Sequence, residues 1–247
     1  MIQIINAEVS SDGFLIFQSL NLNLQPVSYL ISGKNGSGKT SLLKLLAGKL
    51  QPRSGSLHYD FIDDILDWDQ KFELRKKYIH YVQAQALHEL ITTPDFYYQQ
   101  RYYTIENTTL PTVRDYLGER IGNVTKINLP DSFQLEHLLG LELTRLSNGQ
   151  VKKVVILKQL LDAIPKILLL DYPFEGLDAQ SRIELREFLD HLAQEHQVQL
   201  IIADQYHPHL PQSINYELEI VNSEVKPRPL QKSSSITLSK IVLHSVA

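Results

Sequence analysis

Hydrophobic and polar residues alternate near the start of this chain and give way to short apolar runs farther along. Between residues 14 and 31 apolar and polar side chains alternate, with apolar residues at Phe17, Leu20, Leu22 and Leu24. A period of about two residues predicts half-buried strands. The apolar runs within residues 167–170 and 199–202 predict strands that are buried on both faces of a parallel sheet.

Segments with helical spacing of apolar residues separate these strands. Residues 41–50, 151–161 and 182–194 each carry apolar side chains on one face, which predicts amphipathic helices. Gly48 and Pro165 are expected to end the first two helices. Strands that alternate with helices in this order predict an α/β fold with a mostly parallel sheet.

A glycine-rich segment connects a strand expected at 27–31 to the first helix. It matches the pattern G-x-x-x-x-G-K-[ST] through Gly33, Lys34, Asn35, Gly36, Ser37, Gly38, Lys39 and Thr40. Such a loop points backbone N–H groups at phosphate oxygens, and the following helix adds the positive end of its dipole. We expect Lys39 to reach the β- and γ-phosphates, Thr40 to bind Mg²⁺ and Ser41 to line the same site. The segment therefore predicts a binding site for ATP and Mg²⁺.

Three weaker motifs follow this loop along the chain. The first, before the 151–161 helix, consists of Leu146, Ser147, Asn148, Gly149 and Gln150, and by itself it would be only a helix cap and turn. The second is Asp171, at the end of the apolar run 167–170, where its carboxylate is expected to hold Mg²⁺ through water. The third is Gly176-Leu177-Asp178. Each motif is weak by itself, and their joint order is informative.

With these motifs in this order, the chain resembles the ABC (ATP-binding cassette) ATPase family. Residues 146–150 are similar to the family signature Leu-Ser-Gly-Gly-Gln, with Asn148 in place of one glycine, and residues 176–178 are similar to its D-loop. The resemblance covers about residues 3–220, and residues 170–178 are similar to the branch associated with molybdate transport. It implies a P-loop NTPase fold, in which an ABC-type nucleotide-binding domain combines a mostly parallel sheet, an antiparallel β subdomain and an inserted helical subdomain.

The same resemblance implies the domain boundaries. Residues 1–225 are expected to form the ATP-binding domain, with its core at 1–85 and 166–225 and a helical subdomain at about 86–165. The segment 112–117 is similar to the one that opens the helical subdomain in the family. Because residues 226–247 include Pro227, Pro229 and three consecutive serines, we expect a linker or a loosely docked tail there.

The family works as a head-to-tail dimer that holds two ATP molecules, each between one phosphate loop and the partner's signature. This implies that Ser147, Asn148, Gly149 and Gln150 contact ATP held by a second cassette, identical or related. The family's adenine-stacking aromatic residue is expected upstream of the loop, where Phe14 stands, but Phe14 fits a strand core equally well. The glutamine that senses Mg²⁺ and the γ-phosphate is expected after a strand at 79–82, at Gln83 or Gln85.

The chain departs from the family pattern at two catalytic positions. Tyr172 stands where the family has the glutamate that polarises the attacking water, and Gln205 where it has a switch histidine, with His207 and His209 downstream. A phenol is a poor base at neutral pH, and the loss of a general base costs about 10²–10⁴ in rate. We therefore expect an ATPase that keeps Lys39 and Asp171 but turns over slowly. Glu175 is either a substitute carboxylate or a solvated surface side chain.

Composition narrows the expected partners and location. A formal net charge of −4 without a long basic run argues against nucleic-acid binding, and we interpret residues 75–77 as solvated surface. The absence of cysteine excludes disulfides and thiolate metal sites, and it fits a cytoplasmic protein. No apolar stretch approaches the roughly 20 residues that cross a bilayer. Any work at the membrane would therefore place the chain at its inner face, with a permease as partner.

Two functions share all of these motifs. The first is the ATP-binding subunit of an importer that drives a membrane permease, and the second is a soluble ABC protein that acts as an ATP-gated regulator or clamp. The ordered signature and D-loop argue against a P-loop kinase or GTPase.

The aromatic cluster at 96–103 fits base stacking, partner docking or packing within the helical subdomain.

Overall fold

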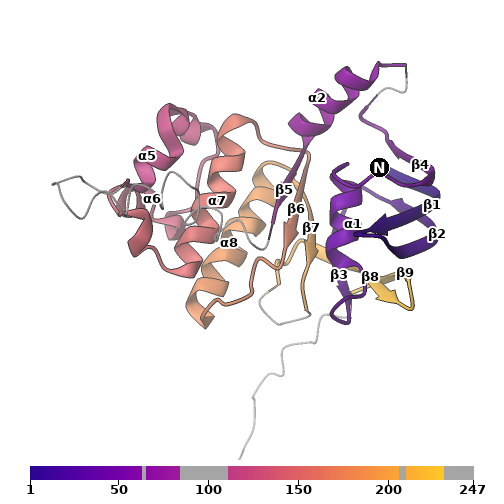
Figure 1. Ribbon diagram of the computed structural model, residues 1–247. Coiled ribbons are helices and arrows are strands. Elements are labelled where there is room, and N and C mark those ends of the chain that lie inside the picture. Colours follow the sequence, from indigo (N-terminus) through magenta and orange to yellow (C-terminus); the bar gives the residue numbers. More distant parts are fainter. Residues whose placement is uncertain (63–64, 84–110, 206–209, 231–247) are drawn as a thin grey trace, which may run out of the picture.

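The computed structural model describes residues 1–62, 65–83, 111–205 and 210–230. Within these ranges the chain forms two sheets, with a helical region on the far side of the larger one (Figure 1). The predictions for Gln85, His207, His209, the aromatic cluster at 96–103 and the residues after 230 lie outside the described residues.

The larger sheet has six strands in the order β5-β6-β7-β3-β8-β9. Its strands are parallel from β5 to β8, and β9 pairs with β8 in the antiparallel direction. The mostly parallel α/β sheet that the sequence predicts is therefore confirmed. The strand bounds are β3 Ser28–Gly33, β5 Ile79–Val82, β6 Ile167–Asp171, β7 Gln199–Ala203, β8 Ile214–Val221 and β9 Glu224–Pro229.

Strand β9 crosses the domain boundary that we expected at residue 225. In the register of the sheet, Pro227 lies opposite Leu218 and Pro229 lies opposite Tyr216. Proline is tolerated in an edge strand because one side of its backbone has no ladder partner. The prolines that predicted a linker thus belong to the sheet.

The smaller sheet is antiparallel and has the strand order β2-β1-β4. Phe17, Leu20, Leu22 and Leu24 are all buried in its core, so the alternation predicted for this segment is confirmed. Helix α1 packs its leucines between the two sheets (Figure 1). The bounds are β1 Ile2–Ser11, β2 Phe14–Leu24, β4 Ser54–Tyr59 and α1 Lys39–Leu46.

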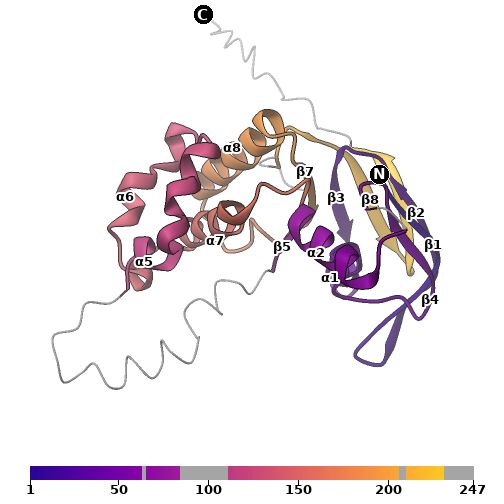
Figure 2. The same ribbon diagram turned by 90° about the horizontal axis from the view of Figure 1, so that it is seen from above.

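Helices cover the opposite face of the larger sheet (Figure 2). Side chains of β6 alternate between the faces, so that Leu168 and Leu170 pack toward the helices while Ile167 and Leu169 pack toward α1. No helix in the described part of the chain is long and apolar enough to cross a membrane. The bounds on this side are α5 Val113–Leu117, η1 Gly118–Lys126, η2 Asp131–Phe133, α6 Leu135–Leu139, η3 Leu143–Arg145, α7 Asn148–Asp162 and α8 Ala179–Glu195. Helix α2, Trp68–Tyr78, packs instead against the core on the α1 side.

Candidate functional site

The phosphate loop connects β3 to α1, as the sequence predicts, and two of its glycines are required by close contacts. Gly33 and Gly38 have positive φ angles of 142° and 104°. A Cβ atom at Gly33 would lie 2.7 Å from the carbonyl oxygen of Ile220, and one at Gly38 would lie 2.6 Å from Cγ2 of Ile16. Only glycine fits these positions without displacing the backbone or the neighbouring strand.

Lys39 is the first residue of α1, and its ammonium lies at the centre of the loop. The residue is only 3% exposed, and its Nζ donates hydrogen bonds to the carbonyl oxygens of Gly33, at 2.7 Å, and Lys34, at 2.9 Å. The buried Oγ of Ser37 has no hydrogen-bond partner within the described part of the chain. Because buried polar groups nearly always have partners, an orphaned hydroxyl in a turn around an ammonium fits a phosphate ligand.

Thr40 and Asp171 meet beside this loop although 131 residues separate them in the chain. The Thr40 hydroxyl donates to Oδ1 of Asp171 at 3.1 Å, and the Tyr81 hydroxyl donates to Oδ2 at 3.2 Å. Burial raises the pKa of the Asp171 carboxyl, while the hydrogen bonds from Thr40 and Tyr81 oppose that rise. A hydroxyl and a carboxylate oxygen are the hard ligands that Mg²⁺ prefers, so these residues fit the predicted metal.

Tyr81 is a site residue that the sequence did not reveal. It lies in β5, opposite Leu169 of β6, and its hydroxyl reaches the carboxylate at the end of the neighbouring strand. No motif marks a tyrosine in a short apolar strand as a partner of Asp171. Only the register between β5 and β6 places it there.

Tyr172 occupies a strained position directly after Asp171. Its φ of 48° lies in the left-handed region, which costs energy for residues other than glycine. The backbone N–H of Tyr172 donates to the Ala203 carbonyl at 2.8 Å. The ammonium of Lys39 lies 5.5 Å from the centre of the Tyr172 ring, within the range of a cation–π contact. The position where the sequence resemblance predicts a glutamate thus presents an aromatic face to the phosphate-loop lysine.

Lys152 in α7 is a second residue that sequence reasoning missed. Its Nζ donates to the carbonyl oxygens of Tyr172, at 2.9 Å, and Glu175, at 2.8 Å. Burial lowers the pKa of this ammonium to about 8, while the carboxylates of Asp204 and Glu175 oppose that fall. Glu175 itself is exposed, in agreement with the solvated alternative. Gln205 is also exposed, and its backbone N–H donates to Asp204 at 2.7 Å.

The lowered pKa of Lys152 predicts that stability depends on pH in the alkaline range. The pKa of Lys152 is about 8 in the folded chain and 10.5 for an ordinary lysine. At pH values between these two, Lys152 binds more protons in the unfolded chain than in the folded chain, so the free energy of unfolding rises with pH. Across this pH range the free energy of unfolding of the wild type should rise by about 1–2 kcal/mol relative to that of Lys152→Met, a value reduced to allow for the partial solvent exposure of Lys152. Urea unfolding of both proteins at pH 7.5 and 10 measures it. A stability difference that stays constant with pH contradicts the prediction.

The signature-like segment forms the start of α7. Ser147 and Gln150 exchange hydrogen bonds as a capping box, so the helix-cap interpretation is correct in the isolated chain. The side-chain amide of Asn148 donates to the Gly176 carbonyl at 3.4 Å. Within the described residues, no hydrogen bond joins 147–150 to the phosphate loop. Ser147 and Asn148 are exposed, and their contact with a partner's ATP stays a prediction.

Gly149 packs α7 tightly against α8. A Cβ atom added there would lie 2.6 Å from both Cβ and Oγ of Ser181. We expect Gly149→Ala to reduce the free energy of unfolding by about 1–3 kcal/mol, because overpacking forces the helices apart. Gly140→Ala is the matched control, since nothing lies within 4 Å of a Cβ at that position. Urea denaturation measures both variants, and equal stabilities would refute the close contact.

Two predicted nucleotide contacts lie at the edges of this site. Phe14 begins β2 and is 75% exposed, which excludes the strand-core alternative and leaves its ring accessible. Its neighbours Leu15 and Ile16 line a cavity of about 410 Å³ together with the phosphate loop and residues 219–223. The stacking role of Phe14 stays a prediction.

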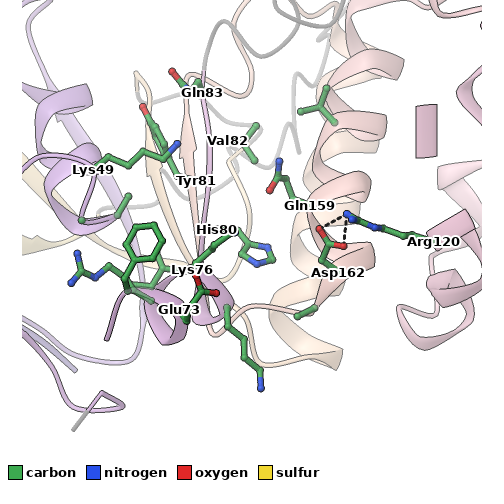
Figure 3. Close-up of a pocket in the computed structure, with 18 residues that line it drawn as sticks. Lys49, Glu73, Lys76, His80, Tyr81, Val82, Gln83, Arg120, Gln159 and Asp162 are labelled. Atoms are coloured by element: carbon green, nitrogen blue, oxygen red, sulfur yellow. Dashed lines mark hydrogen bonds and ion pairs between the residues drawn. The ribbon is translucent and has the colours of Figure 1, made fainter. Parts of the chain in front are cut away.

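Gln83 follows the end of β5 and lines a second cavity, of about 870 Å³, between α2, β5 and α7. Figure 3 shows Gln83 and Tyr81 near one another in this cavity, with the ion pair of Arg120 and Asp162 on its far side. Gln83 lies two residues after Tyr81, whose hydroxyl bonds to Asp171. Its own metal contact stays a prediction.

Comparison with known proteins finds similar sequences and the same fold elsewhere. Residues 17–175 match the protein-family model described as ABC transporter. The macrolide export ATP-binding/permease protein MacB of Campylobacter jejuni is 30% identical over 91% of this chain and 34% of its own length. The cytochrome c biogenesis ATP-binding export protein CcmA of Pseudomonas fluorescens is 30% identical over 71% of this chain and 75% of its own length.

Solved structures agree in fold. A dimeric ATP-binding cassette in a post-hydrolysis state, bound to ADP and Pi, superposes with a TM-score of 0.65 at 21% identity, over 94% of this chain and 99% of the other. The cbiO1 protein of Clostridium perfringens, part of an ABC transporter complex, gives a TM-score of 0.63 at 24% identity, over 91% and 86% of the two chains. The chain spans 34% to 61% of the length of the first curated relatives that it matches.

Proposed function

Because this chain belongs to the ABC transporter family, we propose that it is the ATP-binding part of an ABC system and holds Mg-ATP at the interface of a head-to-tail dimer. The observation that carries the proposal is the meeting of Thr40 and Asp171, at 3.1 Å, next to a loop that surrounds the Lys39 ammonium. A cassette that is solved as a dimer with ADP and Pi shares this fold, which supports the dimeric arrangement.

Each residue of the site has a chemical task in this proposal. The amides of the phosphate loop and the Lys39 ammonium bind the phosphates, for which Lys39 exchanges its present carbonyl partners. Bound Mg²⁺ would neutralise charge on the β- and γ-phosphates, with the Thr40 hydroxyl as a direct ligand and the Asp171 carboxylate holding it through water. Ser147 and the amino-terminal end of α7 would face the γ-phosphate of the ATP that a partner cassette holds.

Hydrolysis is expected to be slow because the described site lacks the family's water-activating glutamate. Tyr172 stands at that position, with its ring toward Lys39, and Gln205 replaces the switch histidine. The binding of ATP does not need Tyr172 or Gln205, since it uses the amides of the phosphate loop, the Lys39 ammonium and the metal. The chain would therefore retain ATP in a closed dimer for longer than an ordinary cassette.

The proposal includes a membrane permease as the partner of this chain. Relatives include a sulfate/thiosulfate import ATP-binding protein of Shigella flexneri, 33% identical over 78% of this chain and 50% of its own length. Such names favour work at the inner face of a membrane, with a permease as partner. A soluble ATP-gated regulator or clamp is the alternative, and co-purification with membranes separates the two. The molybdate branch stays a prediction.

The experiment that tests the proposal is sizing of the purified chain, by light scattering, with Mg-ATP and with ATP plus a chelator. We expect the mass to double only when Mg-ATP is present, because both the metal and the γ-phosphate complete the interface. Phosphate release, measured in the same samples, reports turnover. If calorimetry detects no association with Mg-ATP, the proposed function is wrong.

A further inference from the structure

The amino-terminal half of α7 is tied to the loop that follows Asp171. The Lys152 ammonium bridges the carbonyl oxygens of Tyr172 and Glu175, at 2.9 and 2.8 Å. One turn earlier, the Asn148 amide donates to the carbonyl of Gly176. All of the acceptors are backbone atoms of one short loop, so these contacts fix the path of the loop and not the position of a single side chain.

The other side of this loop is tied to the strand β7. The Tyr172 N–H donates to the Ala203 carbonyl at 2.8 Å, and the Phe174 N–H donates to the buried Asp204 carboxylate at 3.3 Å. The loop also presents the Tyr172 ring to Lys39. It therefore meets the phosphate loop through this ring contact, and its hydrogen bonds go to α7 and to the end of β7.

Helix α7 is in turn anchored to α8 by a largely buried ion pair. The Nζ of Lys153, whose side chain is 5% exposed, lies 2.8 Å from Oε2 of Glu184, and Gly149 packs directly on Ser181. A displacement of the loop would thus move the start of α7 together with α8. The described contacts join Lys39 to Tyr172 and Tyr172 to Lys152, and helix α7 connects Lys152 to its N-cap, Ser147.

We propose that Lys152 is a positioning residue that couples the nucleotide on this chain's phosphate loop to the signature that the chain presents to its partner. The inference rests on the proposed function. When phosphate replaces the carbonyl partners of Lys39, the Lys39–Tyr172 contact changes, the loop moves, and Lys152 transmits this movement to α7. Burial makes the ammonium costly at this place, and such costs are concentrated at functional sites.

Hydrogen exchange of the full chain with and without Mg-ADP tests the coupling. This nucleotide offers a β-phosphate to Lys39 but lacks the γ-phosphate that a partner's signature would contact, so the chain stays monomeric and sizing verifies it. In the wild type, we expect nucleotide to slow exchange in peptides that cover 33–41 and, about threefold, in those that cover 146–152. In Lys152→Met, nucleotide should still slow exchange in peptides 33–41 but should no longer slow it in peptides 146–152. Lys152→Arg, which can also donate to two carbonyls, should restore the effect in peptides 146–152.

Controls separate coupling from a general loss of structure. Lys158→Met removes another lysine of α7, one whose Nζ lies over the Tyr116 ring, and it should behave as the wild type does. If wild-type peptides 33–41 show no effect of nucleotide, both the proposed function and this inference fail. The coupling is refuted, while the proposed function stands, if nucleotide slows exchange in peptides 33–41 but not in peptides 146–152. It is also refuted if nucleotide slows exchange in peptides 146–152 of Lys152→Met as much as in the wild type.

Discussion

Replacement of Lys39 by alanine is expected to weaken the binding of Mg-ATP by about 10²-fold or more. The ammonium is buried at the centre of the loop, and hydrogen bonds between charged groups in such places contribute about 1.5–3 kcal/mol each. No other cation is held by the loop's carbonyls within the described residues, so nothing nearby would substitute. Isothermal titration calorimetry with the purified chain measures the change.

Lys34→Ala is the matched control for this variant, since it removes an equal charge from the same loop. Lys34 is exposed, and its expected contribution to phosphate binding is a backbone amide that the substitution keeps. We therefore expect its affinity to fall only a few-fold. Thermal unfolding of both variants excludes a general loss of structure. Wild-type affinity in Lys39→Ala would refute the assignment of this loop to phosphate.

Tyr172→Glu is expected to raise the turnover of ATP by about 10²-fold, because it supplies a general base where the described chain has none. The backbone at this position is already held by Ala203, Lys152 and the left-handed φ of 48°. Glutamate meets the same backbone restriction as tyrosine there, so the loop should keep its path. Steady-state phosphate release at saturating Mg-ATP measures the effect.

Tyr172→Gln distinguishes basicity from the mere removal of the ring. Glutamine has the size of glutamate but cannot accept a proton from water, so its turnover should stay near the wild-type value while its affinity for Mg-ATP matches that of Tyr172→Glu. If Tyr172→Glu and Tyr172→Gln both turned over ATP faster than the wild type at equal rates, the tyrosine ring would limit turnover by blocking water, and not by the absence of a general base. A fast wild type would contradict slow hydrolysis altogether.

The residues of the candidate site differ in how far the sequence could predict them. The phosphate loop is local, because its glycines, lysine and threonine are adjacent and each is needed for backbone or phosphate geometry. Tyr81 and Lys152 have no such motif. They became recognisable only when the register of β5 on β6, and the packing of α7 on the loop after Asp171, brought their polar ends to named acceptors.

Two sequence predictions at the edges of the sheets were wrong or undecided because they relied on local patterns. Pro227 and Pro229 predicted a linker, yet the antiparallel pairing with β8 uses them in an edge strand. The alternation around Phe14 could not decide whether this first residue of β2 is covered, and it is 75% exposed because the sheet's core begins farther along the strand.

The sequence by itself determined the α/β class, the alternation of strands and helices around the buried strands, and the phosphate loop, since these follow from hydrophobic periodicity and from residues that are neighbours in the chain. Only the tertiary structure decided that Thr40 meets Asp171 across 131 residues, that Tyr172 turns its ring to Lys39, and that Lys152 ties α7 to the same loop. The reason is physical. These contacts depend on strand register and helix packing, which no short stretch of sequence encodes.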